Sequence, residues 1–130
     1  MMIRFILYLS LFALLVGCGE PLSGSFRAVG FHDNQKYKID VNIGGIVSAP
    51  TLAIFLNDEQ ALYVERPMSM MSDANCEKLL AYGWKCRFSD TYKGLQVAVV
   101  EEINASPYFN YRHYDVYLDG QLLQRVIGTF

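Results

Sequence analysis

The chain has no run of basic residues and few of the residue types that build metal centres. Its 130 residues include 11 Lys and Arg against 13 Asp and Glu, interspersed along the sequence. Nucleic-acid binding is not expected, because it requires a concentrated positive surface. The two histidines, His32 and His113, do not stand at ligand spacing from the three cysteines. We therefore expect no zinc site and no other cofactor.

The common catalytic motifs are missing as well. The sequence has no glycine-rich phosphate loop, no H-E-x-x-H motif and no nucleophile elbow. His32 and Asp33 are adjacent, and neighbours on a strand point to opposite faces. His113 has no obvious nucleophile nearby in the sequence. Glu101 and Glu102 are adjacent too, which suits no two-carboxylate mechanism and favours a solvated strand end. The chain is not expected to be an enzyme.

The longest apolar run, residues 5–16, is too short to cross a bilayer as a helix, which requires roughly 20 residues. It follows Arg4, the only charged residue before Glu20, and it ends in small residues. A positive start, a short apolar stretch and small residues at its end are typical of a secretory signal.

The end of this run, Leu15-Val16-Gly17-Cys18, resembles the lipobox of bacterial lipoproteins. The resemblance implies that a diacylglyceryl group is attached to the Cys18 thiol, that the signal is cut before Cys18, and that the new amine is acylated. Two or three acyl chains anchor a protein stably in a membrane. The next residue is Gly19 rather than Asp, which implies the periplasmic face of the outer membrane if the host is enteric-like.

Three segments follow from this interpretation. Residues 1–17 are the cleaved signal, 18–25 a lipidated tether and 26–130 a single domain. Removing 17 of the 130 residues leaves 113, a size that suits one domain with a modest core. The signal carries only Arg4, so 10 basic and 13 acidic residues remain, a formal charge of −3. The tether contains Pro, Gly and Ser and spans at most roughly 25 Å.

With Cys18 acylated, Cys76 and Cys86 are left as a candidate disulfide. An exported protein meets an oxidising compartment, where such pairs usually form a bridge. Closing a loop of about eleven residues would contribute roughly 2.5–3 kcal/mol to stability. Two buried thiols are the alternative.

Alternating apolar and polar residues predict seven or eight short strands in the domain. The expected strands are 26–31, 37–43, 51–56, 61–65, 84–89, 95–102, 111–118 and 121–127. Gly44 and Gly45 are expected to break the second strand. The segment 95–102 is apolar on both faces and is expected to be central.

The last two strands flank Asp119-Gly120, the signature of a two-residue type I′ turn. In that register Val116 faces Leu123 and Tyr117 faces Leu122.

One short helix is expected over residues 73–82, with Asp73 as its N-cap and Gly83 after its C-terminus. The disulfide would then join this helix to the next strand. The predicted fold is mainly β, a small antiparallel sandwich or a partly closed barrel with one short helix.

An aromatic stretch, residues 108–117, is the first candidate for partner binding. On a strand Tyr111, His113, Asp115 and Tyr117 share one face, and Arg112, Tyr114, Val116 and Leu118 share the other. Both faces carry aromatic residues, so one can enter the core and leave the other at least partly exposed. Tyr is common at the centre of protein interfaces. Tyr108, Tyr111 and Tyr117 are the candidate contacts. The alternative is that these tyrosines pack only against neighbouring strands.

A methionine-rich predicted loop is the second candidate. Met68, Met70 and Met71 offer flexible, polarisable side chains that suit adaptable contacts, and Arg66 adds a charge beside Pro67. The alternative is a loop folded back over one end of the domain.

These features favour a protein-binding lipoprotein, and more narrowly an inhibitor or immunity protein that occludes a toxin or hydrolase acting in the envelope. The alternative is a structural or assembly accessory of an envelope machine, such as a secretion, conjugation or pilus system. A lipid or small-ligand carrier would need an apolar cavity of several hundred Å³.

Overall fold

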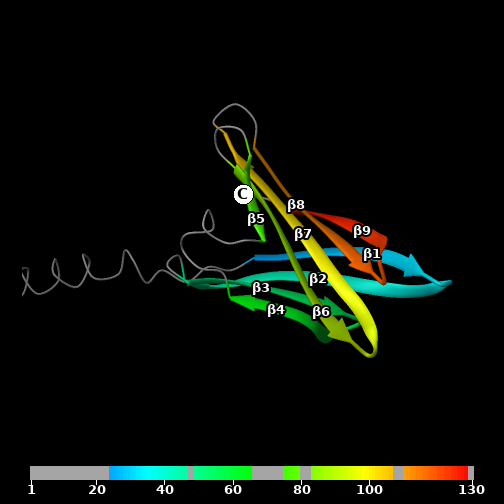
Figure 1. The fold of residues 1–130 in the computed structure, drawn as a ribbon. Helices are drawn as coiled ribbons and strands as arrows, with labels where there is room; N and C mark the ends of the chain where they lie inside the picture. The colour runs from blue at the N-terminus through cyan, green and yellow to red at the C-terminus, as the bar shows by residue number, and fades with distance from the viewer. Residues whose placement is uncertain (1–23, 47–48, 66–74, 80–82, 107–109, 129–130) are drawn as a thin grey trace, which may run out of the picture.

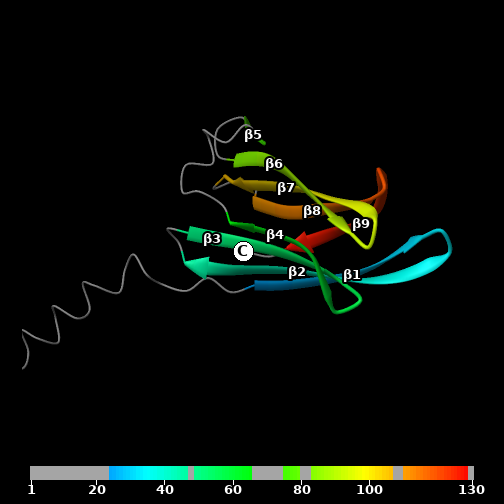
Figure 2. The same cartoon turned by 60° about the horizontal axis from the view of Figure 1, so that its bottom comes forward.

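The computed structural model describes residues 24–46, 49–65, 75–79, 83–106 and 110–128. This part of the chain is almost entirely β-strand, arranged in two antiparallel sheets (Figures 1 and 2). One sheet has four strands, β1 (Gly24–His32), β2 (Gln35–Ile46), β3 (Ala49–Leu56) and β4 (Glu59–Glu65). The other has five, β5 (Cys76–Leu79), β6 (Gly83–Tyr92), β7 (Leu95–Ala105), β8 (Asn110–Leu118) and β9 (Gln121–Gly128). The expectation of a mainly β, antiparallel fold is confirmed.

Each sheet is a simple meander in which every strand pairs with the next strand along the chain. Tight turns make this possible, because four connections use two residues with left-handed backbone angles (φ from 48° to 78°). Positive φ at both central positions is the type I′ geometry, whose twist matches paired strands. The turn residues are Asp33-Asn34, Asn57-Asp58, Lys93-Gly94 and Asp119-Gly120. The last of these turns was expected from the sequence.

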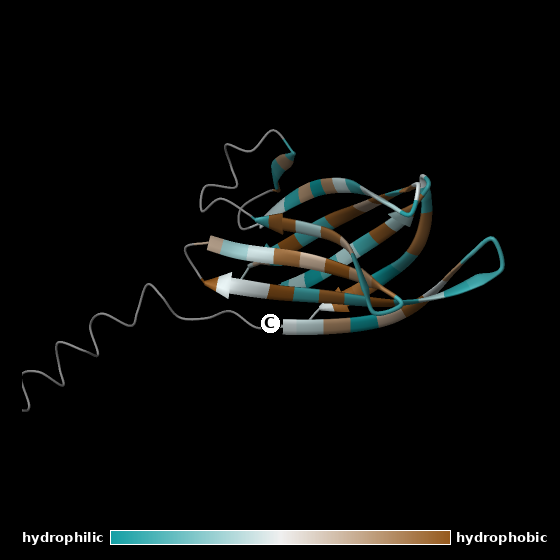
Figure 3. Ribbon diagram, turned by 90° about the horizontal axis from the view of Figure 1, so that it is seen from below, coloured by the Kyte–Doolittle hydropathy of each residue, from teal (hydrophilic) through white to brown (hydrophobic). Residues whose placement is uncertain are grey.

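The core lies between the sheets and takes alternate residues from nearly every strand. Figure 3 shows the alternation of polar and apolar residues along the strands. β2 and β3 contribute Ile39, Val41, Leu52 and Ile54, all fully buried, and the five-stranded sheet contributes side chains such as Val99, Tyr114, Val116 and Leu118. Central β7 is buried on both faces at Val97, Ala98 and Val99, as its apolar sequence predicts.

The sheets approach each other closely at one pair of edges, where β1 lies beside β9. Gly30 is required there, because a Cβ at this position would lie 2.5 Å from the Leu123 backbone oxygen. At the other side β4 lies near β6. There Glu59, which follows the β3–β4 turn, contacts two residues of the other sheet. Its carboxylate accepts a hydrogen bond from Tyr92 Oη (2.9 Å), at the end of β6, and pairs with Lys93 Nζ (3.1 Å), in the β6–β7 turn. These contacts lower the pKa of the Glu59 carboxyl, the Tyr92 hydrogen bond most of all.

The expected helix is wrong where the structure describes that segment. Cys76–Leu79 is the edge strand β5, and Gly83 opens β6 instead of ending a helix. The reason is tertiary: β5 pairs with β6 in a register that places Cys76 opposite Cys86. A short segment has too little intrinsic helix preference to resist this pairing.

Three smaller expectations are corrected too. β2 does not break at Gly44-Gly45 but continues to Ile46, with Gly45 at φ 78°. β1 begins at Gly24, inside the segment assigned to the tether. A bulge in the β8–β9 hairpin keeps Tyr117 opposite Leu122 but places Val116 opposite Gln124. Leu123 therefore turns inward and is buried, whereas Leu122 is exposed.

Candidate partner-binding face

The outer face of the five-stranded sheet carries ordered rows of polar and aromatic side chains. Register aligns Lys85, Glu102 and His113 in one row across β6, β7 and β8, and Arg87, Val100 and Asp115 in the next. A third row holds Ser89, Ala98 and Tyr117. Each row arises because residues two apart on a strand share a face.

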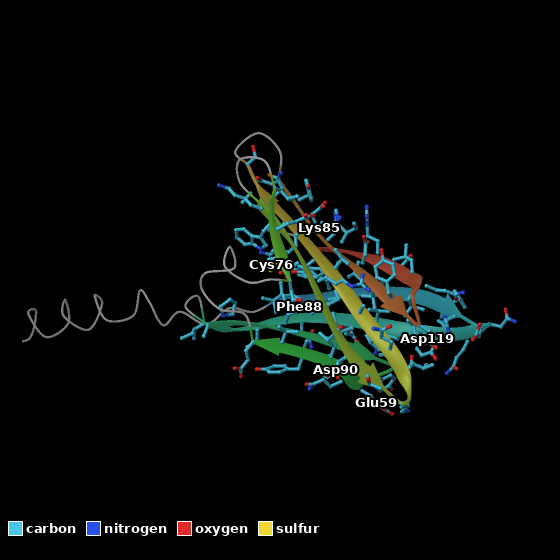
Figure 4. The ribbon with its side chains drawn as sticks, in the orientation of Figure 1. Glu59, Cys76, Lys85, Phe88, Asp90 and Asp119 are labelled. Atoms are coloured by element: carbon cyan, nitrogen blue, oxygen red, sulfur yellow. A yellow bond between two sulfur atoms is a disulfide. The ribbon has the colours of Figure 1, made fainter. Side chains whose placement is uncertain are left out.

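Between these rows and β5 lies a hollow of about 430 Å³, which we call the charged hollow. Its walls include Glu77, Lys85, Arg87, Val100, Asp115, Tyr117 and the Cys76–Cys86 pair. In Figure 4, Lys85 and Cys76 lie toward the end of the sheet that carries β5, whereas Asp90 lies toward the opposite end, where Glu59 of the four-stranded sheet is also labelled.

A disulfide fixes the β5 wall of the charged hollow. Cys76 and Cys86 are directly opposite in the β5–β6 ladder, with Cα atoms 4.0 Å apart, and their sulfurs are bonded at 2.03 Å. The expected disulfide is confirmed. Because β5 is a four-residue edge strand that pairs only with β6, the bond holds this strand in place.

Asp115 and Arg125 form a two-point ion pair at the β8 side. Arg125 Nε donates to Asp115 Oδ1 at 2.7 Å, and its second nitrogen donates to Oδ2 at 3.0 Å. These hydrogen bonds are the main reason that the pKa of Asp115 lies below its ordinary value; burial opposes the shift, and the charges of Arg125, His113 and Lys85 assist it. Asp115 is thus ionised and neutralised within the protein.

Arg87 and Lys85 differ from Arg125, because neither forms an ion pair within the described part of the chain. The Arg87 guanidinium carbon lies 5.7 Å from the centroid of the Tyr117 ring, a cation–π arrangement. Both residues are exposed on β6. The hollow therefore presents two cationic side chains, the acidic side chain of Glu77 and an aromatic ring.

A second cluster adjoins the hollow. His113 Nε2 lies 3.1 Å from Glu102 Oε2, and the Tyr111 ring stacks on the His113 ring at 5.3 Å. Burial raises the pKa of Tyr111 above its ordinary value, and the neighbouring Glu102 carboxylate adds to the shift. These contacts hold Tyr111 and His113 as a fixed aromatic ledge.

A smaller hollow of about 180 Å³ lies on the outer face of the four-stranded sheet. Its charges are already paired, with Arg27 Nε 2.8 Å from Asp40 Oδ1 and, beside it, Lys38 Nζ 3.0 Å from Asp58 Oδ1. Its charged side chains are therefore less available to a charged partner than those of the charged hollow.

Of the residues predicted to bind a partner, Tyr111 and Tyr117 lie on the outer face of the five-stranded sheet, together with His113 and Asp115. The remaining predicted residues lie outside the described part of the chain: the lipidation residue Cys18 and the predicted contacts Arg66, Met68, Met70, Met71 and Tyr108.

Sequence reasoning missed Lys85 and Arg87. The available signal was the alternation of these two cations with Cys86 and Phe88, which places both on the wet side of a strand.

Two interpretations of acidic and histidine neighbours are wrong. Glu101 is not at a solvated strand end but fully buried, because β7 runs on to Ala105 and places it mid-strand on the inner face, opposite Tyr114. His32 and Asp33 do not point apart: Asp33 is a turn residue, and its Oδ2 lies 3.3 Å from His32 Nε2.

Among the described residues, no three His, Cys, Asp or Glu side chains gather into a metal-binding group. The same residues contain no helix long and apolar enough to cross a membrane.

In comparisons with known proteins, no protein-family model, curated protein or solved structure matches this chain.

Proposed function

We propose that this chain is an outer-membrane lipoprotein whose mature part, a small antiparallel β-sandwich, binds a protein in the cell envelope and blocks its activity. Acylated Cys18 would hold the domain on the periplasmic side of the membrane. The charged hollow and the aromatic ledge would receive the partner, a toxin or hydrolase that acts in the envelope.

The observation that carries this proposal is the placement of Arg87 over Tyr117 beside Lys85, a cation that forms no ion pair with the residues described by the structure. Arg and Tyr are the residue types most enriched among the side chains that dominate binding energy in protein interfaces. Here they stand on a hydrogen-bonded sheet, so little side-chain or backbone ordering is required on binding.

Charge indicates the chemistry of the partner. Asp115 is neutralised by Arg125, and Glu102 lies against His113, whereas neither Lys85 nor Arg87 forms an ion pair among the described residues, although Glu77 of β5 lies opposite Lys85 in the ladder. An acidic loop of the partner entering the hollow would supply the missing carboxylates, and Arg binds carboxylates in a two-point geometry.

The test is binding by the lipidated protein to envelope extracts, with Arg87→Glu compared against Lys36→Glu. Lys36 is exposed on β2 in the other sheet, so the control makes the same charge change away from the hollow. We expect Arg87→Glu to weaken binding of one specific protein by about 30-fold or more, a loss typical of an interface hot spot. Lys36→Glu should bind like wild type. Equal binding by Arg87→Glu would contradict the proposal.

A structural or assembly accessory would use the same surface for a permanent partner. Deletion separates the two: loss of an inhibitor matters only when the toxin or hydrolase is present, whereas loss of an accessory impairs assembly in a pure culture.

A further inference from the structure

Two large apolar side chains are exposed on β9, the edge strand of the five-stranded sheet. They are Leu122, which is 54% exposed, and Ile127, which is 65% exposed. The register pairs Leu122 with Tyr117 and Ile127 with His113, and both of these β8 residues belong to the outer face of the sheet. Because directly paired residues point to the same face, Leu122 and Ile127 project from the face that carries the charged hollow.

A β-bulge is the reason that both side chains share this face. Leu122 and Ile127 are five positions apart, and a regular strand would turn them to opposite faces. The register shift in the β8–β9 ladder gives β9 one extra residue, which reverses the alternation between the two positions. The burial pattern agrees, since Leu123 and Val126 are three positions apart and both are buried.

The two apolar side chains and the two cations of the charged hollow lie on opposite sides of one surface. β8 and β7 separate β9 from β6, so a strand spacing of about 4.8 Å places the two groups roughly 14 Å apart. The aromatic residues Tyr117 and His113 lie between them, on β8. We call the charged hollow together with Tyr117, His113, Leu122 and Ile127 the extended face.

Single exposed apolar side chains are ordinary on protein surfaces. Leu122 and Ile127 differ because each adjoins an aromatic residue of the candidate site. The Cβ atoms of directly paired residues lie about 4.5–5.5 Å apart, so Leu122 stands beside the Tyr117 ring and Ile127 beside the His113 ring. The Tyr117 ring in turn lies under the Arg87 guanidinium. Apolar and cationic contacts are thus linked through these aromatic rings.

We propose that the partner contacts both sides of the extended face, with carboxylates meeting Lys85 and Arg87 and apolar side chains covering Leu122 and Ile127. This inference rests on the proposed function and deepens it, because it states the chemistry of the partner's surface. The partner is a protein whose contact surface is acidic at one side and apolar at the other, roughly 14 Å away.

This two-part chemistry makes the extended face selective. An entirely apolar partner would bury Lys85 and Arg87 without counter-charges, which is costly. An entirely acidic partner would gain nothing from Leu122 and Ile127. The Asp115–Arg125 pair lies between the two apolar side chains, and a partner can cover it without leaving either charge unpaired.

The experiment places a photoreactive residue at Leu122, Ile127, Ser89 or Phe31 of the full chain in living cells. Ser89 is exposed on the outward face of β6, beside the charged hollow. Phe31 is the matched control, because it is 66% exposed but lies on β1, in the other sheet. Mass spectrometry identifies each captured protein and the peptide that is crosslinked.

We expect Leu122 and Ile127 to capture the same protein as Ser89. The peptides captured from β9 should carry apolar side chains, and the peptide captured from Ser89 should contain Asp or Glu. Phe31 should not capture this protein.

Affinity for the captured protein, once purified, provides the second measurement. Leu122→Ser combined with Ile127→Ser should weaken binding about ten-fold or more, because the partner's apolar side chains lose their contacts. Val29→Ser combined with Phe31→Ser is the control: these side chains are 42 and 66% exposed on the other sheet, and this variant should bind like wild type. All four side chains are exposed, so neither variant should lose its fold.

Capture from Ser89 but not from both Leu122 and Ile127, or unchanged affinity of the Leu122→Ser/Ile127→Ser protein, would overturn the inference and leave the proposed function standing. Absence of capture from Ser89 would overturn both. Capture of a second copy of this chain from β9, or equal capture from Phe31, would also overturn the inference.

Discussion

At the scale of single residues, the outer face of the five-stranded sheet separates charges that are satisfied from charges that are available. Asp115 is held by two hydrogen bonds from Arg125, and its side chain is only 14% exposed. Lys85 and Arg87 stand across the same hollow without an ion pair among the described residues. The first pair stabilises the sheet, and the two cations are available to the proposed partner.

The Asp115–Arg125 pair makes a prediction about pH. The pKa of Asp115 lies below the ordinary value of 3.8, so its contribution to stability is present above that value and is lost as pH falls through the folded-state pKa. Asp115→Asn should lower the free energy of unfolding by about 1 kcal/mol at pH 7, because Arg125 is half exposed and solvent screens the pair. The difference from wild type should vanish in strong acid.

Urea unfolding at several pH values measures this effect. Asp58→Asn is the control, since its pair with Lys38 is exposed and should contribute only a few tenths of a kcal/mol. A difference between Asp115→Asn and wild type that persists unchanged well below pH 3 would show that the ion pair is not its origin.

At the scale of elements, strands with strict alternation could be predicted closely, and segments defined by their partners could not. Central β7 was evident because its residues are apolar on both faces, and the β8–β9 turn because Asp119-Gly120 suits left-handed backbone. The sequence predicts a helix where β5 forms, because no local sequence pattern indicates that this segment pairs with β6. The buried position of Glu101 was missed for the same reason, since it depends on how far β7 extends.

The candidate site was also only partly predictable. Strand alternation placed Tyr111 and Tyr117 on one face, but the pairing of β6 with β7 and β8 is what brings Arg87 to Tyr117. Sequence patterns fix which residues share a face of one strand; they do not fix the register between strands.

The disulfide carries the prediction that belongs to this scale. Replacing Cys76 and Cys86 together by Ala should lower the free energy of unfolding by about 2.5–3 kcal/mol, the cost of releasing a loop of about eleven residues. Hydrogen exchange should rise in β5, which pairs only with β6, and change little in β7.

Reduction of the wild-type protein serves as the control and should give the same loss as the double substitution. A free-thiol assay on the oxidised mature protein should find almost no thiol. Two reactive thiols, or unchanged stability of the Cys76→Ala/Cys86→Ala protein, would contradict a structural disulfide at this site.

At the scale of the whole molecule, the proposed anchor and the proposed binding face lie at different parts of the domain. In sequence, Cys18 precedes β1 of the four-stranded sheet, whereas the charged hollow lies beside β5 and β6 of the five-stranded sheet. Under the proposed function, this face would meet proteins that act in the periplasm while the proposed lipid anchor would keep the domain at the membrane.

The most direct measurement of the central claim is site-specific photo-crosslinking in living cells. A photoreactive residue at Ser89, exposed on the same outward face of β6 as Arg87, should join the chain to one envelope protein. The same residue at Lys36, exposed on the other sheet, should not. Crosslinking of that protein from Ser89 alone is the predicted result; a partner captured equally from Lys36, or no crosslink from Ser89 in cells that contain the anchored protein, would contradict the account.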